Sequence, residues 1–207
     1  PALVKAMADA GCVGVLIGFE SLRSDLLNTL NKKSNESVEL YERSLALLKQ
    51  NHICVYATFL FGVDGDDVSS FPRTLKFAMK HQFFLVAFNH LVPFPGTPLY
   101  AKLAGQGRMI SDAWWLEESF RFGQVPYRPQ MLPPDELAET CRHYRRKFYS
   151  TKSIIRRALA PMTNMQSLST LALFLTQNYY GRREVDEKFG IPLGLPEENH
   201  LLADLNR

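Results

Sequence analysis

Three runs of almost entirely apolar residues, separated by segments with helical patterns, constrain the fold of this chain more than any other feature. The runs are "CVGVLIGF" (12–19), "ICVYATFLF" (53–61) and "FFLVAFNHLVPF" (83–94). A strand that is buried on both faces reads as a continuous apolar run, which is typical of parallel sheets. Strands that alternate with helices indicate right-handed βαβ units. The sequence therefore predicts an α/β fold around three parallel strands, too few to close a barrel.

The predicted helices lie between and after these strands. Apolar periodicity and turn residues predict helices over 3–10, two helices within 22–50, one over 71–80 and one after the turn at 93–97. The chain then becomes loop-rich and is helical again from about residue 134. A last helix is predicted over 164–180, with one apolar side formed by Met165, Leu168, Ala172, Leu175 and Tyr179. We therefore divide the chain into residues 1–105, the strand-bearing part, and residues 106–207, a loop-rich and helical extension.

Composition and charge exclude several classes of partner. Of the 207 residues, 46% are hydrophobic and 22% charged, with a net charge of +3, as in ordinary globular proteins. Two basic clusters are interpreted as solvated helix faces, so no nucleic-acid partner is predicted: Arg142, Arg145, Arg146, Lys147 and Arg156, Arg157. There is no long apolar stretch and no signal-peptide pattern, which predicts a cytoplasmic protein without a transmembrane segment.

The cysteines and histidines do not form a metal-binding pattern. Cys12, Cys54 and Cys141 are far apart and lie among apolar residues, as reduced core thiols do. The five histidines are equally scattered. We therefore predict no metal ligands in this chain.

Candidate site residues come from the carboxyl ends of the strands, where ligands bind in parallel α/β folds. Strand alternation places Gly14, Leu16, Gly18 and Glu20 on one face, and the glycines leave room for a ligand beside the carboxylate. The second strand presents Tyr56, Thr58, Leu60 and Gly62 in the same way. In the third strand, Asn89 is the candidate for the cavity side, because an amide can both donate and accept hydrogen bonds.

Each of these residues also has a structural interpretation. Gly18 and Gly62 could simply form turns, Glu20 could favour the start of the next helix by its charge, and Ser21 could be the N-cap of that helix. His90 is interpreted as a packed or hydrogen-bonded core residue rather than a catalyst. The acidic run Asp64, Asp66, Asp67 could bind Mg²⁺ or Ca²⁺, but it lacks the full calcium-loop pattern, so we favour charge at a helix N-terminus.

Taken together, the three strand ends resemble a known family. "GVLIGFES", "TFLFGVDGDD" and "LVPFPGTPLY" resemble consecutive strand ends in the carboxyl-terminal half of a radical S-adenosylmethionine (radical SAM) enzyme barrel. "RPQMLPPDELAETCRHYRRKFYSTKSIIRR" is similar to the segment after the barrel in the subgroup that carries an amino-terminal cobalamin (B12)-binding domain. The resemblance covers residues 1–160, with a weaker part at 178–194. "GVDGDD" departs from the family's usual Gly-Leu-Pro-Gly-Glu pattern.

The resemblance implies a fold, a cofactor and a set of binding residues. The fold would be the last three units of a (β/α)₆ partial TIM barrel, followed by a mainly helical extension. In such enzymes a 4Fe-4S cluster cleaves S-adenosylmethionine to a 5′-deoxyadenosyl radical, which attacks an unactivated carbon of a small-molecule substrate. Glu20 and Ser21 would contact the ribose or methionyl end, and the proline elbow would hold adenine. The implied cofactor-binding residues are Gly18, Glu20, Ser21, Leu60, Gly62, Pro93, Phe94, Pro95 and Gly96, with Thr58 and Asn89 on the substrate side.

One element of the family pattern is missing. The cluster of these enzymes is held by C-x-x-x-C-x-x-C, and no such spacing occurs in this sequence. We therefore expect a fragment, a truncated gene product or one subunit of a split enzyme, which contains no catalytic residue of its own. The 4Fe-4S cluster and the cobalamin would be bound by the full-length protein, and the missing half of the barrel would be supplied by that protein or by a partner chain. The alternative is a non-catalytic half-barrel that serves as a binding module.

Overall fold

The computed structural model describes residues 1–29 and 38–193 and shows an α/β fold with one parallel sheet. Strands β1 (Gly14–Glu20), β2 (Cys54–Phe61) and β3 (Leu85–His90) lie side by side in the order β1-β2-β3, and both neighbouring pairs are parallel. The sequence prediction of three parallel strands is confirmed. β3 is shorter than the predicted run 83–94, since the ladder closes with Leu91 N donating to Phe61 O and the prolines that follow have no N–H to donate.

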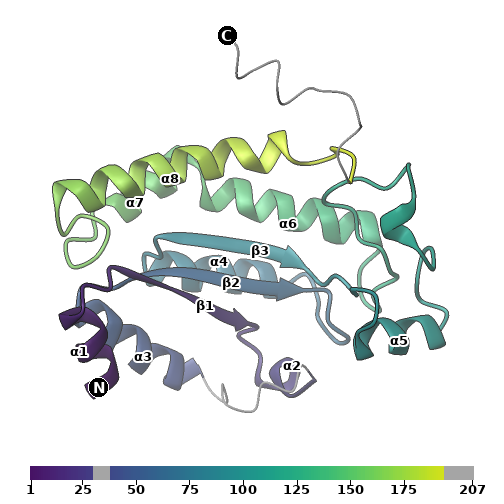
Figure 1. Cartoon of the computed structure of the whole chain (residues 1–207), viewed down its shortest axis with the longest axis horizontal. Coiled ribbons are helices and arrows are strands. Elements are labelled where there is room, and N and C mark those ends of the chain that lie inside the picture. The colour runs from purple at the N-terminus through teal and green to yellow at the C-terminus, as the bar shows by residue number, and fades with distance from the viewer. Residues whose placement is uncertain (30–37, 194–207) are drawn as a thin grey trace, which may run out of the picture.

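Helices connect the strands and continue after them (Figure 1). The part of the chain that carries the strands contains α1 (Ala2–Asp9), α2 (Ser24–Thr29), α3 (Val38–Gln50), α4 (Ser70–Lys80) and α5 (Pro98–Gly105). After the short 3₁₀ helix η1 (Trp114–Leu116) come α6 (Pro134–Phe148), α7 (Thr151–Ala158) and α8 (Leu168–Glu187). In the described part of the chain, no helix is long and apolar enough to cross a membrane.

The core lies on the helix-covered face of the sheet. Phe19 from β1 stacks on Phe59 from β2 with ring centroids 5.5 Å apart, and Tyr41 of α3 meets Phe19 edge-on. Phe61 stacks on Phe71 of α4 at 4.0 Å and on Phe88 of β3 at 5.8 Å. These rings form one continuous aromatic core that fixes α3 and α4 behind the strands (Figure 1).

The helical extension packs directly onto the strand-bearing part. Helix α6 contacts β3 and α4, and its Leu137 and Phe148 are fully buried in the same core. The predicted boundary at residue 105 remains a prediction, but the two parts share one hydrophobic core. Helix α8 runs along α6 and α7 (Figure 1).

Arg157 corrects one interpretation of the sequence. This arginine, read as part of a solvated helix face, is 0% exposed, and its guanidinium lies 3.8 Å from the centre of the Phe148 ring. It donates to the carbonyls of Phe83, Phe84 and Phe148 and to Oδ1 of Asn178 in α8. The guanidinium therefore joins the start of β3, the end of α6 and the middle of α8.

Helix α8 shows a second correction. The residues predicted to form its apolar side are all exposed, and Leu168 reaches 87%: Met165, Leu168, Ala172, Leu175 and Tyr179. The helix instead buries Phe174, Asn178 and Val185. Phe174 packs on Phe84, and Asn178 hydrogen-bonds to Arg157, a polar contact that apolar periodicity does not reveal.

Candidate functional site

The carboxyl ends of the three strands bring several predicted residues onto one face of the sheet. Gly18 pairs with Thr58, and Leu60 pairs with Asn89, so these four residues share the face opposite the aromatic core. Thr58 and Leu60 are half-buried, and Asn89 is exposed. Polar and apolar groups from all three strands are therefore accessible at this edge.

Glu20 ends β1 in an unusual backbone conformation. Its φ is +61°, and the pairing register shifts between Gly18 and Glu20. A Cβ atom on Gly18 would lie 2.7 Å from Oε1 of Glu20 and 3.6 Å from Oγ1 of Thr58. Gly18 thus leaves the space that the Glu20 carboxylate occupies. The glutamate, glycine and threonine form one compact group at the junction of β1 and β2.

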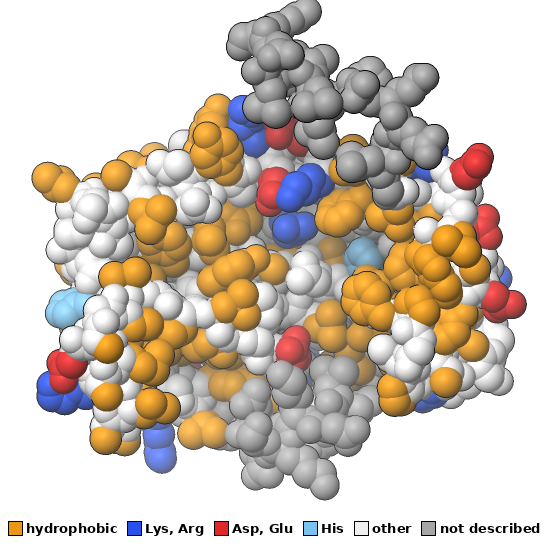
Figure 2. Space-filling model, in the orientation of Figure 1, with side chains coloured by type: hydrophobic (Ala, Val, Ile, Leu, Met, Phe, Trp, Pro, Cys, Tyr) orange, Lys and Arg blue, Asp and Glu red, His pale blue; other side chains and the backbone are white. Residues whose placement is uncertain are grey.

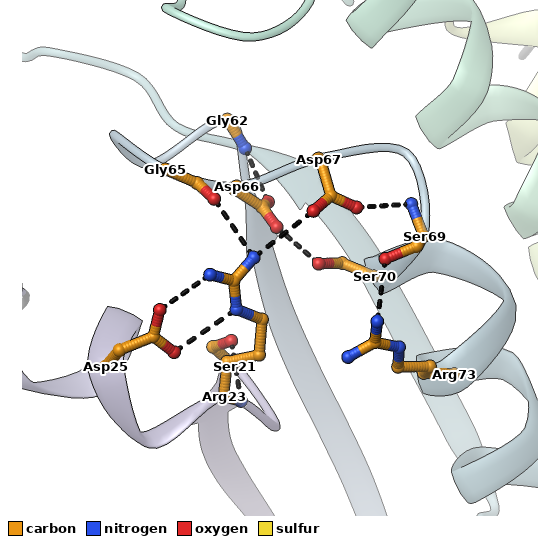
Figure 3. A network of polar contacts seen from close by, with 10 residues as sticks. All are labelled: Ser21, Arg23, Asp25, Gly62, Gly65, Asp66, Asp67, Ser69, Ser70 and Arg73. Carbon is orange, nitrogen blue, oxygen red and sulfur yellow. Dashed lines mark hydrogen bonds and ion pairs between the residues drawn. The ribbon is translucent and has the colours of Figure 1, made fainter.

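Ser21 belongs to a polar network that ties the end of β1 to the end of β2 (Figure 3). Its Oγ accepts a hydrogen bond from Arg23 N at 3.1 Å, which shapes the turn before α2. Arg23 then donates to Asp25 and to the carbonyl of Gly65, and pairs with Asp67 at 3.4 Å. The interpretation of Ser21 as the N-cap of the next helix was wrong, because α2 begins three residues later, at Ser24. The Ser21 hydroxyl shapes the turn before the helix instead.

The acidic run after β2 is engaged by groups of the protein. Asp66 is buried, accepts from Gly62 N at 3.0 Å and from Ser70 Oγ at 2.5 Å, and burial raises its pKa (Figure 3). Asp67 accepts from Ser69 N at 2.7 Å, next to the start of α4. Asp64 pairs with Lys102 and Arg108. Asp66 and Asp67 thus contact residues at the start of α4, where the structural interpretation of the run placed their charge, although none of them lies in the first turn of that helix. Asp64 does not follow this interpretation, because it pairs with residues outside α4.

Gly62 does not lie with the other predicted residues. Its N–H donates to Asp66, and its carbonyl accepts from Tyr127 Oη at 2.6 Å. A Cβ on this residue would lie 2.5 Å from Leu137 Cδ2 and 2.6 Å from Tyr127 Oη. The space next to Gly62 is filled by the protein, so its small size serves packing against α6.

The proline elbow forms a rigid turn between β3 and α5. Pro93 is buried, whereas Phe94, Pro95 and Gly96 are exposed, and Gly96 has a φ of +77° that favours glycine. Thr97 caps α5 by accepting from Tyr100 N, and its hydroxyl donates to the Phe94 carbonyl at 2.6 Å. One carbonyl of the elbow is thus used within the turn, and the Phe94 ring is 61% exposed and offers an apolar surface.

A cavity of about 880 Å³ adjoins these strand ends. Leu60, Asn89, Phe94 and Pro95 line it on one side. The opposite walls come from residues 114–126 and from α6, α8 and Phe189: they include Trp114, Trp115, Phe120, Phe122, Cys141, Arg142, Arg145 and Glu184. Figure 2 shows hydrophobic side chains gathered over the segment between α5 and α6, next to a hollow in this face. Leu60 also borders a hollow of about 30 Å³ beside Glu20 and Ser21, and so separates the two spaces.

Two titratable groups on the cavity wall are uncharged at neutral pH. Burial lowers the pKa of His90, a hydrogen bond with the backbone of Gln124 partly opposes this effect, and nearby Arg145 adds to it; the resulting pKa is about 4. Burial also raises the pKa of the Cys141 thiol. The interpretation of His90 as a hydrogen-bonded residue rather than a catalyst agrees with this environment.

Sequence reasoning missed the segment 114–126 and the inward side of α6. The adjacent pair Trp114–Trp115, in an otherwise loop-rich region, was the available signal, because large aromatic residues in loops often line binding sites. Arg145 had been grouped with the solvated basic residues, but it is half-buried and lines the cavity.

The three cysteines are free thiols that do not lie together. Cys54 and Cys141 are buried and Cys12 is half-buried, which confirms their interpretation as reduced thiols. Burial raises the pKa of Cys54 to about 11. Among residues 1–29 and 38–193, no group of three or more His, Cys, Asp or Glu side chains could hold a metal ion.

Comparison with known proteins relates the chain to methyltransferases and a cyclase. It is 30% identical over 157 residues to the bacteriochlorophyllide d C-12(1)-methyltransferase of Chlorobaculum tepidum, which covers 76% of this chain and 33% of that enzyme. It is 25% identical over 152 residues (73% of this chain, 24% of the relative) to the anaerobic magnesium-protoporphyrin IX monomethyl ester cyclase of Cereibacter sphaeroides. The hopanoid C-2 methylase of Rhodopseudomonas palustris is 22% identical over 157 residues, 76% of this chain and 28% of the methylase.

These matches establish a distant relationship over about three quarters of the chain. The chain spans a third or less of the length of these three relatives. No family model matches it.

Proposed function

We propose that this chain is the carboxyl-terminal part of a cobalamin-associated radical SAM enzyme that methylates or cyclises an apolar small molecule. The observation that carries the proposal is the carboxyl edge of the sheet, where Glu20 and Thr58 lie together at the junction of β1 and β2 and Asn89, on the same face, lines a large apolar cavity. The relatives are named as methyltransferases and a cyclase, and these activities support the same reaction class.

The sheet edge is consistent with a place in a longer barrel. Within the described residues β1 pairs only with β2, and Leu16 on β1 and Val13 just before it are each 64% exposed. An unpaired edge of this kind recruits another strand. In this proposal β1 to β3 are the last three strands of a (β/α)₆ partial barrel, and the rest of the protein or a partner chain supplies the strand next to β1.

The strand ends fit the adenosyl part of S-adenosylmethionine. The Glu20 carboxylate, held beside the glycine at position 18, can accept hydrogen bonds from ribose hydroxyls or from the ammonium group. The elbow places the exposed Phe94 ring where it can stack on a purine. When bound and reductively cleaved, this cofactor supplies a radical that removes hydrogen from an unactivated carbon.

The cysteines of this chain do not fit a 4Fe-4S cluster. Thiolate ligands need accessible, easily ionised thiols, whereas Cys54 and Cys141 are buried with raised pKa values. We therefore assign the cluster and the cobalamin to parts of the enzyme outside this chain. The role of the chain is to bind the cofactor and the substrate and to exclude water from the reacting carbon through the aromatic walls of the cavity.

The test is S-adenosylmethionine affinity in the complete enzyme with its cluster reconstituted. Glu20→Gln removes the charge at the end of β1 and should weaken the affinity roughly tenfold to a hundredfold, as expected for about 1.5–3 kcal/mol from a charged hydrogen bond. Asn89→Ala should lower turnover more than cofactor affinity, since Asn89 lines the cavity. Glu136→Gln, an exposed change in the first turn of α6, is the matched control. Unchanged affinity in a folded Glu20→Gln enzyme would reduce Glu20 to a structural residue.

A further inference from the structure

We propose that the 880 Å³ cavity binds a large, ring-bearing apolar acid, and that Arg145 receives its carboxylate. The proposal rests on the proposed function only in treating this molecule as the substrate. The rings and the carboxylate of the ligand are inferred from the volume and the lining residues of the cavity.

The size and the walls of the cavity favour a large aromatic or multi-ring molecule. Ligand pockets range from about 300 to 1,000 Å³, so this one is near the upper end. Trp114 contacts Phe120 and Trp115 with ring centroids 5.0 and 5.8 Å apart, and the exposed Phe94 ring faces the same space from the elbow. Aromatic walls of this kind gain most from flat ring surfaces.

Arg145 supplies the charge. It lines the cavity from α6, and its side chain makes no hydrogen bond or ion pair with any residue of 1–29 or 38–193. Its Nε is buried without an acceptor. A guanidinium that is partly removed from water is normally paired, and its fork of donors matches a carboxylate. An anionic group on the ligand would provide that partner.

The other charged groups on the wall are already engaged. Arg142 pairs with Glu139 and Asp186 and lies 4.5 Å from the centre of the Phe189 ring. Glu184 pairs with Lys188. The cavity therefore presents one cation that the described residues leave unpaired, which favours a single carboxylate over a neutral or a cationic ligand.

Trp114 gives an independent indication that an acceptor belongs at this wall. Its side chain is 6% exposed, and its Nε1–H is buried without a hydrogen-bond partner among the described residues. Buried donors in proteins are nearly always satisfied. Because Trp114 lines the cavity, we expect an acceptor on the ligand to be the partner of this donor.

The test uses two probes that share the pyrene ring and a four-carbon chain, 1-pyrenebutyrate with a terminal carboxylate and 1-pyrenebutanol with a neutral hydroxyl. The chain has two tryptophans, Trp114 and Trp115, and both line the cavity, so energy transfer from tryptophan to pyrene reports binding at this place. We expect the native chain to bind the acid about tenfold or more tightly than the alcohol. Arg145→Gln should abolish that preference and leave the affinity for the alcohol unchanged.

Arg156→Gln is the matched control, because it removes the same charge from an exposed position on α7 outside the cavity. If Arg145→Gln fails to fold, Arg145→Lys should retain only part of the preference, because an ammonium lacks the guanidinium fork. The proposal is overturned if the native chain binds acid and alcohol equally, if neither probe accepts energy from tryptophan, or if both arginine variants weaken acid binding alike. A complete enzyme that binds the acid through Arg145 but does not bind S-adenosylmethionine would refute the proposed function alone.

Discussion

Replacing Arg157 with Met tests whether one buried cation holds the helical extension on the sheet. The guanidinium makes hydrogen bonds of 2.9 Å to Phe83 O, 3.1 Å to Phe148 O and 2.8 Å to Asn178 Oδ1. Met has nearly the same length but no donor, so these acceptors lose the donor that the arginine provides. The substitution keeps an apolar side chain at this position and removes both the polar contacts and the guanidinium that lies over the Phe148 and Phe174 rings.

The expected magnitude follows from the acceptors that are left behind. An unsatisfied buried acceptor lowers the free energy of unfolding by about 1–3 kcal/mol. Burial also disfavours the charged guanidinium, as the lowered pKa of Arg157 indicates. Removal of this charge therefore offsets part of the loss. We expect the free energy of unfolding to fall by about 2–4 kcal/mol. For a chain of this size that corresponds to a fall in melting temperature of about 5–15 °C.

The assay is urea denaturation of the native chain and of Arg157→Met, followed by circular dichroism. The midpoint should fall without a change in the slope m, since the surface exposed on unfolding is the same. Arg156→Met, an exposed change one residue earlier, should shift stability by less than about 0.5 kcal/mol. Equal stabilities for Arg157→Met and the native chain would show that the buried network adds nothing to the fold.

Two further predictions concern residues at the strand ends. Gly62→Ala should destabilise the chain by about 2–4 kcal/mol in the same urea assay, because the new Cβ would overlap Leu137 and Tyr127 and the residue has a φ of +87°. Gly105→Ala is the control, since the space around its Cβ is open, and equal effects of the two substitutions would contradict the packing argument. His90 has a folded-state pKa of about 4, below its ordinary value of 6.5, so the unfolded chain takes up a proton first and stability falls as pH drops from about 6.5 to 4. The loss should be of order 1–3 kcal/mol and absent in His90→Gln, and parallel pH profiles for the two proteins would refute it.

The sequence by itself determined the local elements and their order. The apolar runs over 12–19 and 53–61 predicted β1 and β2 of a parallel sheet, and their alternation placed Gly18 and Thr58 on one face. The expectation that the first run is buried on both faces was wrong, because Val13 and Leu16 are each 64% exposed. Thr97 and Pro98 mark the start of α5, because Thr97 is the N-cap of the helix and Pro98 is its first residue. These features depend on neighbours a few positions away, and periodicity and turn chemistry reveal them.

The tertiary structure decided which faces and which charges were buried. The sequence alone predicts a surface position for Arg157, but in the fold backbone carbonyls near the start of β3 and at the end of α6 accept hydrogen bonds from it. Asn178 of α8 also binds Arg157, so the side of α8 that faces the protein differs from the apolar side that periodicity predicts. The sequence predicts that Gly62 leaves room for a ligand, but in the structure Leu137 and Tyr127, which lie 65 or more residues later, fill the space beside it. The cavity likewise needs β3, residues 114–126 and α6 together, because contacts between distant segments form only when the whole chain packs.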